Sequence, residues 1–180
     1  MTTTVPILLL VTVGFVALAF GGCTPKHTPE PETAAIPPQT KAWMDRLTVR
    51  TEYDPKTGFI VAREVIPLPA ALQDAPPLPQ ALDAARQSGK PVLVFATADR
   101  CGPCQQYKKD ALNDPRVVAW IGEGRAHVAH VEVDRQADAV SLLPSAAIPM
   151  TYWMVDGKVT ASLRGQRSAE ELLEFVRGRS

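Results

Sequence analysis

The sequence predicts an α/β fold with a central mixed sheet flanked by helices. From Pro79 onward, short apolar runs alternate with longer segments of helical spacing, which is the pattern of strands joined by helices. The run 92–95 (Val-Leu-Val-Phe) is apolar throughout, as is typical of a strand buried on both faces. The length of 180 residues and the formal net charge of zero suit one ordinary domain and indicate no nucleic-acid partner.

The elements of this domain, 79–180, are marked by residues that favour helix ends and turns. Gly89 ends the first helix, Pro115 suits the first turn of a short helix, and residues 156–157 (Asp-Gly) favour a tight turn between two strands. Ser168, with a glutamate three positions on, predicts a capping box. We therefore expect, in order, helix 79–88, strand 91–96, helix 104–112, helix 116–121, strand 126–133, helix 136–143, strand 150–155, strand 158–163 and helix 168–177.

Residues 41–78 are expected to form a hairpin-like extension and a Pro-rich connector ahead of the main domain. The runs 47–53 and 58–65 are rich in β-branched and aromatic residues, and they flank a turn sequence at 54–58 (Asp-Pro-Lys-Thr-Gly). The resulting hairpin either extends the sheet or covers its edge.

The N-terminal segment, 1–22, has a different character. It is apolar from Ile7 to Phe20, and a run of about 14 residues suits a signal peptide better than a membrane span, which needs ~20. Small residues stand directly before Cys23, which resembles the lipobox of bacterial lipoproteins and implies lipidation of that cysteine. The alternative is an uncleaved anchor with Cys23 incidental. Both interpretations predict a membrane-anchored protein facing the periplasm or cell exterior, with 23–40 as a Pro-rich linker.

A Cys-Gly-Pro-Cys motif, from Cys101 to Cys104, stands between the predicted strand 91–96 and the following helix. A helix start presents unpaired N–H groups and a partial positive charge, and both favour the thiolate of Cys101, which is the nucleophile. Cys104, nearly one turn on, can then attack a mixed disulfide at Cys101. Such a dithiol indicates a thioredoxin-like redox motif rather than a structural bridge.

The order of elements from Pro79 onward, together with this motif, resembles the thioredoxin fold over roughly 100 residues. Residues 107–117, where a helix ends at Asp-Pro, further resemble membrane-linked thiol–disulfide interchange domains. The resemblance makes the first cysteine the attacking one and the second the resolving one. It also implies a family cis-proline at Pro149 and a substrate groove, formed by Gly102, Pro103, Ile148, Pro149 and Gly165. For Gly165, an ordinary turn glycine is the alternative.

Three positions depart from the family pattern. Arg100 replaces the aromatic residue before the first cysteine, and its positive charge would favour the Cys101 thiolate. Phe95 stands where the family carries a buried acid, so the usual proton acceptor for the resolving thiol is missing. His130 is a candidate substitute, because imidazole titrates near neutral pH. The alternatives are a solvated arginine and a histidine without a chemical role.

The leading functional hypothesis is an extracytoplasmic, membrane-tethered thiol–disulfide oxidoreductase that reduces protein disulfides through Cys101 and Cys104. No diffusible cofactor is expected, so electrons come from a membrane-bound or soluble donor protein. One alternative is a non-catalytic binding module that keeps the fold. Another is metal handling by the two cysteines with His127 and His130, although that spacing matches zinc sites poorly.

Overall fold

The computed structural model describes residues 35–179. The predicted signal or anchor segment, Cys23 and most of the 23–40 linker lie outside these residues. Between residues 35 and 179, no helix has the length and apolar character that crossing a membrane requires.

The centre of the fold is a four-stranded mixed sheet in the order β4-β3-β5-β6. β3 (Val92–Thr97) pairs in parallel with β4 (His127–Glu132) and antiparallel with β5 (Met150–Val155). β6 (Lys158–Arg164) pairs antiparallel with β5. Every residue of β3 is buried, as the uninterrupted apolar run predicts. The predicted mixed sheet is therefore confirmed.

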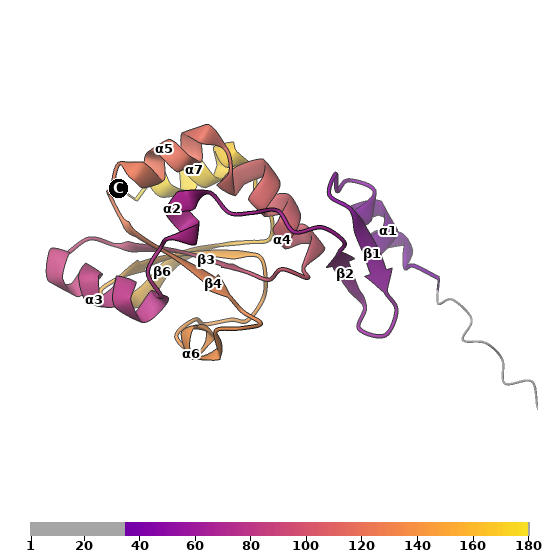
Figure 1. Cartoon of the computed structure of the whole chain (residues 1–180), viewed down its shortest axis with the longest axis horizontal. Coiled ribbons are helices and arrows are strands. Elements are labelled where there is room, and N and C mark those ends of the chain that lie inside the picture. The colour runs from indigo at the N-terminus through magenta and orange to yellow at the C-terminus, as the bar shows by residue number, and fades with distance from the viewer. Residues whose placement is uncertain (1–34, 180) are drawn as a thin grey trace, which may run out of the picture. The chain divides into compact units, whose positions relative to one another are not determined.

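Helices cover both faces of this sheet (Figure 1). On one face a core cluster joins the sheet to residues of α2, the α4 segment, α5 and α7. On the other face a second cluster joins it to residues of α3 and α6. The helices span Ala70–Gln73 (α2), Leu78–Ser88 (α3), Gly102–Tyr107 (α4), Pro115–Gly122 (α5), Ala137–Val140 (α6) and Ala169–Arg177 (α7).

Local signals in the sequence predict several of these details correctly. The capping box of α7 is present, because Ser168 Oγ accepts from the backbone N–H of Glu171 and the Glu171 carboxylate accepts from the N–H of Ser168. Asp156 and Gly157 have φ angles of 51° and 73°, which is the left-handed backbone of a tight hairpin turn.

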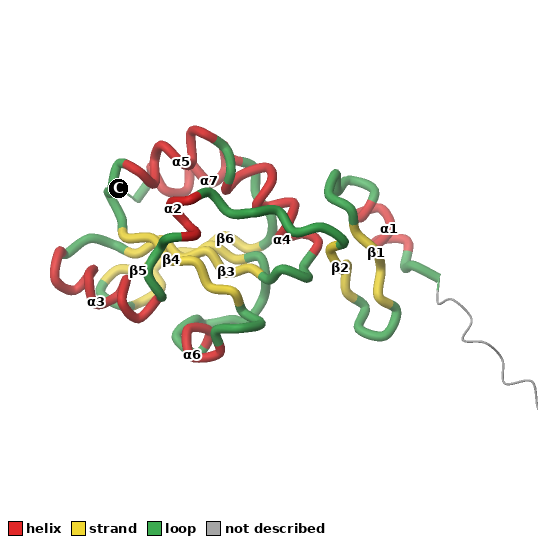
Figure 2. Tube along the Cα trace, in the orientation of Figure 1, coloured by secondary structure: helices red, strands yellow, loops and turns green. Residues whose placement is uncertain are grey.

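The predicted N-terminal hairpin is also confirmed. β1 (Thr51–Asp54) pairs antiparallel with β2 (Phe59–Ala62), and the two form a separate two-stranded sheet. Figure 2 shows this hairpin beside the start of α4, away from the strands of the main sheet. It therefore does not extend the main sheet.

The helix expected at 136–143 is shorter than predicted, since α6 spans only Ala137–Val140. Beyond it, the amides of Leu142 and Leu143 donate to carbonyls three residues back instead of four, so the last turn tightens. Pro144 follows, and it has no N–H with which to continue the pattern.

Three further helical features were not expected. The helix predicted at 104–112 begins at Gly102 and changes after α4 into a π-helical turn, η1 (Lys108–Leu112). α1 (Pro38–Met44) and α2 (Ala70–Gln73) lie in segments whose proline content indicates extended linkers. Proline also suits the first turn of a helix, and Leu72 of α2 is buried in the core. The formation of α2 is therefore better explained by its packing against the core than by its local sequence.

Candidate active site

The two cysteines of the motif lie where β3 gives way to α4, and they form a disulfide. Cys101 is the N-cap residue of α4, and its Sγ accepts a hydrogen bond from the backbone N–H of Cys104 at 3.2 Å. An N–H directed at sulfur favours thiolate over thiol once the disulfide is reduced. Cys104 is 0% exposed, whereas Cys101 is partly exposed. An incoming disulfide can therefore reach Cys101 but not Cys104.

Residues 38–62, which contain α1, β1 and β2, form what we call the N-terminal cover. Its strand β2 reaches the motif directly, because Val61 and Cys101 form an isolated antiparallel bridge and the N–H of Ala62 donates to the carbonyl of Arg100 at 2.8 Å. A Cβ atom on Gly102 would lie 2.8 Å from Thr51 Cγ2. Only glycine at this position lets the hairpin pack so closely over the start of α4.

Two buried glutamines that follow the motif hold flanking chain segments in place. The Gln106 side-chain oxygen accepts from the backbone N–H groups of Thr48 and Val49, at 2.7 and 3.1 Å. The Gln105 side-chain oxygen accepts from the N–H of Ile66 at 2.7 Å. Both side chains are almost fully buried, so these bonds are shielded from water. Sequence reasoning missed this role, because adjacent polar residues on a helix usually indicate an exposed face.

A pocket of about 590 Å³ opens beside the disulfide. Its lining includes Cys101, Pro103 and Ile148 from the main domain. The N-terminal cover supplies much of the remainder, including Trp43 and residues 57–61. The pocket is therefore built jointly by the predicted redox motif and by a segment that lies far from it in the sequence.

The predicted groove residues are only partly gathered in this pocket. Pro103 and Ile148 line it, whereas Gly102 is buried beneath the hairpin. The Ile148–Pro149 peptide bond is cis, as the family pattern predicts. The carbonyl of Pro149 accepts from the N–H of Gly165 at 2.9 Å, and Gly165 has a φ of 81°. Pro149 and Gly165 are not among the residues that line the pocket.

Arg100 and Asp134 are the two charged residues that line the same pocket. Both are exposed, and neither side chain forms a hydrogen bond or ion pair with another residue in the range 35–179. The guanidinium of Arg100 adjoins Cys101 in the sequence and adds positive charge at the pocket rim.

His130, the predicted proton acceptor, lies on β4 opposite Phe95 of β3. Its Nε2 shares a hydrogen bond of 2.7 Å with Thr97 Oγ1. Burial first, and the positive charge of Lys108 second, lower the pKa of His130 to about 4. The imidazole is therefore uncharged at neutral pH, and it does not line the pocket beside Cys101.

A group of charged residues lies beneath the helix that carries the motif. Lys108 is 2% exposed, and its Nζ donates to Asp99 Oδ1 at 3.1 Å. Arg135 binds the other oxygen of Asp99 at 2.8 Å. Burial acts to raise the pKa of Asp99, but the hydrogen bonds and charges of Lys108 and Arg135 together outweigh it, and the pKa is lowered. Burial raises the pKa of Glu132, whose carboxylate accepts from the N–H of Asp99.

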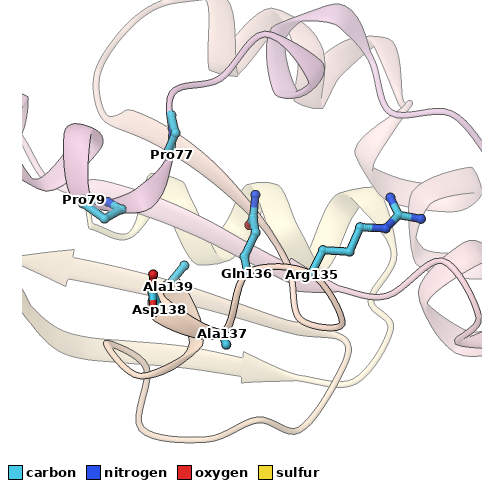
Figure 3. Close-up of a pocket in the computed structure, with 7 residues that line it drawn as sticks. All are labelled: Pro77, Pro79, Arg135, Gln136, Ala137, Asp138 and Ala139. Carbon is cyan, nitrogen blue, oxygen red and sulfur yellow. The ribbon is translucent and has the colours of Figure 1, made fainter.

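A second, smaller pocket of about 370 Å³ lies between the start of α3 and α6. Figure 3 shows its lining, in which Pro77 and Pro79 face the segment 135–139. No cysteine lines it. In the described part of the chain, no three or more His, Cys, Asp or Glu side chains are grouped so that they could hold a metal ion.

The mixed sheet, its helical layers and the dithiol at the start of α4 define a thioredoxin-like fold. Comparison with known families agrees, since residues 72–154 match a family model described as "Thioredoxin-like". The predicted fold is therefore confirmed, and the match supports the predicted thioredoxin-like family. Together with the disulfide, the fold supports a redox-type function. The matched range begins after the N-terminal cover, so α1, β1 and β2 lie outside it. Among curated proteins, no significant match was found.

Solved structures similar to this chain include several thioredoxins. A thioredoxin from Thermus thermophilus is 29% identical, with a TM-score of 0.47, and the match covers 57% of this chain and 82% of that one. A wild-type poplar thioredoxin h is 25% identical, with a TM-score of 0.46, over 56% of this chain and 85% of that one. A Fasciola hepatica thioredoxin is 24% identical, with a TM-score of 0.45, over 54% and 89%.

Proposed function

We propose that this protein is a membrane-tethered thiol–disulfide oxidoreductase that works outside the cytoplasm and reduces protein disulfides. The observation that carries the proposal is the unequal exposure of the two sulfurs. Cys101 opens onto a pocket, while Cys104 is fully buried one turn away on the same helix. This arrangement suits one cysteine that meets the substrate and a second that reacts only with the first.

The reduction proceeds in two exchange steps. The Cys101 thiolate attacks one sulfur of the substrate disulfide, so a Cys101–substrate bond forms while the substrate bond breaks, and the released thiolate takes a proton from water. The Cys104 thiolate then attacks the Cys101 sulfur and forms the disulfide seen here, and the second substrate thiol leaves. Two electrons pass to the substrate. A donor protein with its own dithiol returns them by the same exchange in reverse.

The residues between the cysteines support the reducing direction of exchange. Gly102 and Pro103 resemble the two residues between the cysteines of reducing family members such as thioredoxin, whose reduction potential is about −270 mV. A redox titration against glutathione buffers measures this directly. A potential near the ~−120 mV of strong oxidants would reverse the proposed direction.

Turnover is tested by reduction of insulin with a small dithiol as the electron donor. Wild-type protein is expected to accelerate the reduction, and Cys101→Ser is expected to abolish the acceleration. Cys104→Ser is expected to stop turnover and to accumulate a mixed disulfide at Cys101, because the resolving sulfur is missing. Absence of turnover in the wild type would refute the proposal and favour a binding module.

The membrane tether rests on the lipobox-like sequence before Cys23 and on the Pro-rich linker that follows. In cells fed a labelled fatty acid, the protein is expected to carry the label and to sediment with membranes. Cys23→Ala is expected to lose the label. If the variant sediments with membranes as before, the segment 1–22 is an uncleaved anchor.

A further inference from the structure

We propose that the N-terminal cover is a specificity element that binds a large apolar side chain next to the reacting cysteine of a polypeptide substrate. This inference rests on the proposed function, which it deepens by naming the substrate class. It concerns a segment that lies outside the residues matching the thioredoxin-like family model.

The position of Cys101 determines what enters the pocket beside it. Cys101 is one of its lining residues, and Cys104 is fully buried. In the mixed disulfide, the substrate cysteine is bonded to Cys101, so the chain that carries it must pass through or along this pocket. Because an extended chain advances about 3.3–3.6 Å per residue, the next one or two substrate residues lie within the pocket.

The lining that the cover supplies is largely apolar, with Thr40 and Thr57 as its polar residues. Phe59 is 70% exposed and Trp43 is 38% exposed, and both face the pocket rather than a core. Ile60 and Val61 continue the same wall. Exposed large apolar side chains gathered around a concave site mark a surface that another molecule covers. A substrate side chain such as Phe or Leu would bury these residues, whereas a small polar one would leave them in water.

The wall is held in place before any substrate arrives. Gln106 binds two backbone N–H groups of the cover between α1 and β1, and the bridge between Val61 and Cys101 fixes its C-terminal end. Gly102 lets the hairpin lie in contact with the motif. Because the apolar wall is preformed, little conformational entropy is lost when a substrate binds. The contact with a substrate side chain is therefore expected to raise the rate of exchange.

The experiment uses symmetric disulfide dimers of a short peptide in which the residue next to the cysteine is Phe, Leu or Ser. Symmetry makes the attacked sulfur unambiguous. The rate at which each dimer oxidises the reduced Cys101/Cys104 pair is followed by quenching and alkylation. Wild-type protein is expected to react about tenfold faster with the Phe or Leu dimer than with the Ser dimer.

Phe59→Ser and Trp43→Ser are each expected to lower this preference to about twofold or less. Both side chains are exposed, so the variants are expected to fold. Leu142→Ser is the matched control, because Leu142 is 45% exposed and does not line the pocket. It is expected to keep the wild-type preference.

The outcomes separate this inference from the proposed function. If wild-type protein is oxidised by all dimers at equal rates, the oxidoreductase stands and the specificity role of the cover is wrong. The same conclusion follows if the preference survives in both Phe59→Ser and Trp43→Ser. If neither the dimers nor bis(2-hydroxyethyl) disulfide oxidises the wild-type pair, both proposals fail.

Discussion

Replacing His130 with glutamine is expected to remove a pH-dependent part of the protein's stability. His130 is partly buried on β4, and its ring is hydrogen-bonded to Thr97. Burial in the first place, and the nearby Lys108 charge in the second, lower its pKa from 6.5 to about 4. Glutamine can accept or donate a similar hydrogen bond but does not titrate.

The size and sign of the effect follow from this pKa. Between pH 6.5 and 4, the unfolded chain binds a proton at His130 that the folded protein does not bind, so stability falls as the pH falls. The loss relative to neutral pH is about 2 kcal/mol at pH 5 and about 3 kcal/mol at pH 4. Above pH 6.5 the contribution is fully present and constant.

The assay is urea unfolding of wild type and His130→Gln, followed by tryptophan fluorescence from pH 4 to pH 8. Burial raises the pKa of neighbouring Glu132, so protonation of Glu132 at low pH stabilises the folded protein, opposite to the effect of His130. Both proteins carry Glu132, so its contribution cancels when their free energies of unfolding are subtracted. The wild type is expected to lose about 3 kcal/mol relative to the variant as the pH falls to 4. Parallel curves across this range would refute the reasoning, as would an NMR titration that places the His130 ring near 6.5.

Three further substitutions test the packing of the motif helix. Gly102→Ala is expected to lower the free energy of unfolding in urea by about 1–3 kcal/mol, because its Cβ would overlap the hairpin. Gly122→Ala has open space around it and is expected to leave this free energy unchanged. Gln106→Leu is expected to cost about 2–4 kcal/mol and to speed amide exchange at Thr48, and unchanged exchange would contradict the role of Gln106. Lys108→Met leaves the Asp99 carboxylate with one cation and is expected to lower the free energy of unfolding by about 2–4 kcal/mol above pH 5. An equal loss at pH 3, where Asp99 begins to take up a proton, would contradict the ion pair.

The features that were predicted correctly depend on neighbours in the sequence. The apolar run of β3, the capping box at Ser168 and the left-handed turn at 156–157 are each determined within a few residues. The redox motif can be recognised from the two cysteines, the predicted strand before them and the predicted helix after them. These signals placed Cys101 at the start of α4 and Cys104 one turn inside it.

The features that were missed depend on contacts between distant segments. Gln106 meets Thr48 and Val49 across more than fifty residues, and nothing near Gln106 indicates that it is buried. Lys108 likewise looks like a solvated helix residue until Asp99 is seen beside it. The hairpin was predicted from its turn sequence, but its position over Gly102 depends on tertiary contacts that the local sequence does not indicate. The resemblance covered the domain and could not indicate what the N-terminal cover adds to the pocket.

The surroundings of the motif helix bear on the two interpretations of His130. With a pKa of about 4, holding a proton on this ring at pH 7 costs about 4 kcal/mol, so it is a weak acceptor for the proton of Cys104. Phe95, at the place of the usual acid, accepts no proton either. Lys108 lies four residues after Cys104 along the chain, but its Nζ is bound to Asp99, whose carboxylate offsets the positive charge. The low pKa of His130 and its hydrogen bond to Thr97 therefore favour a structural role for this side chain.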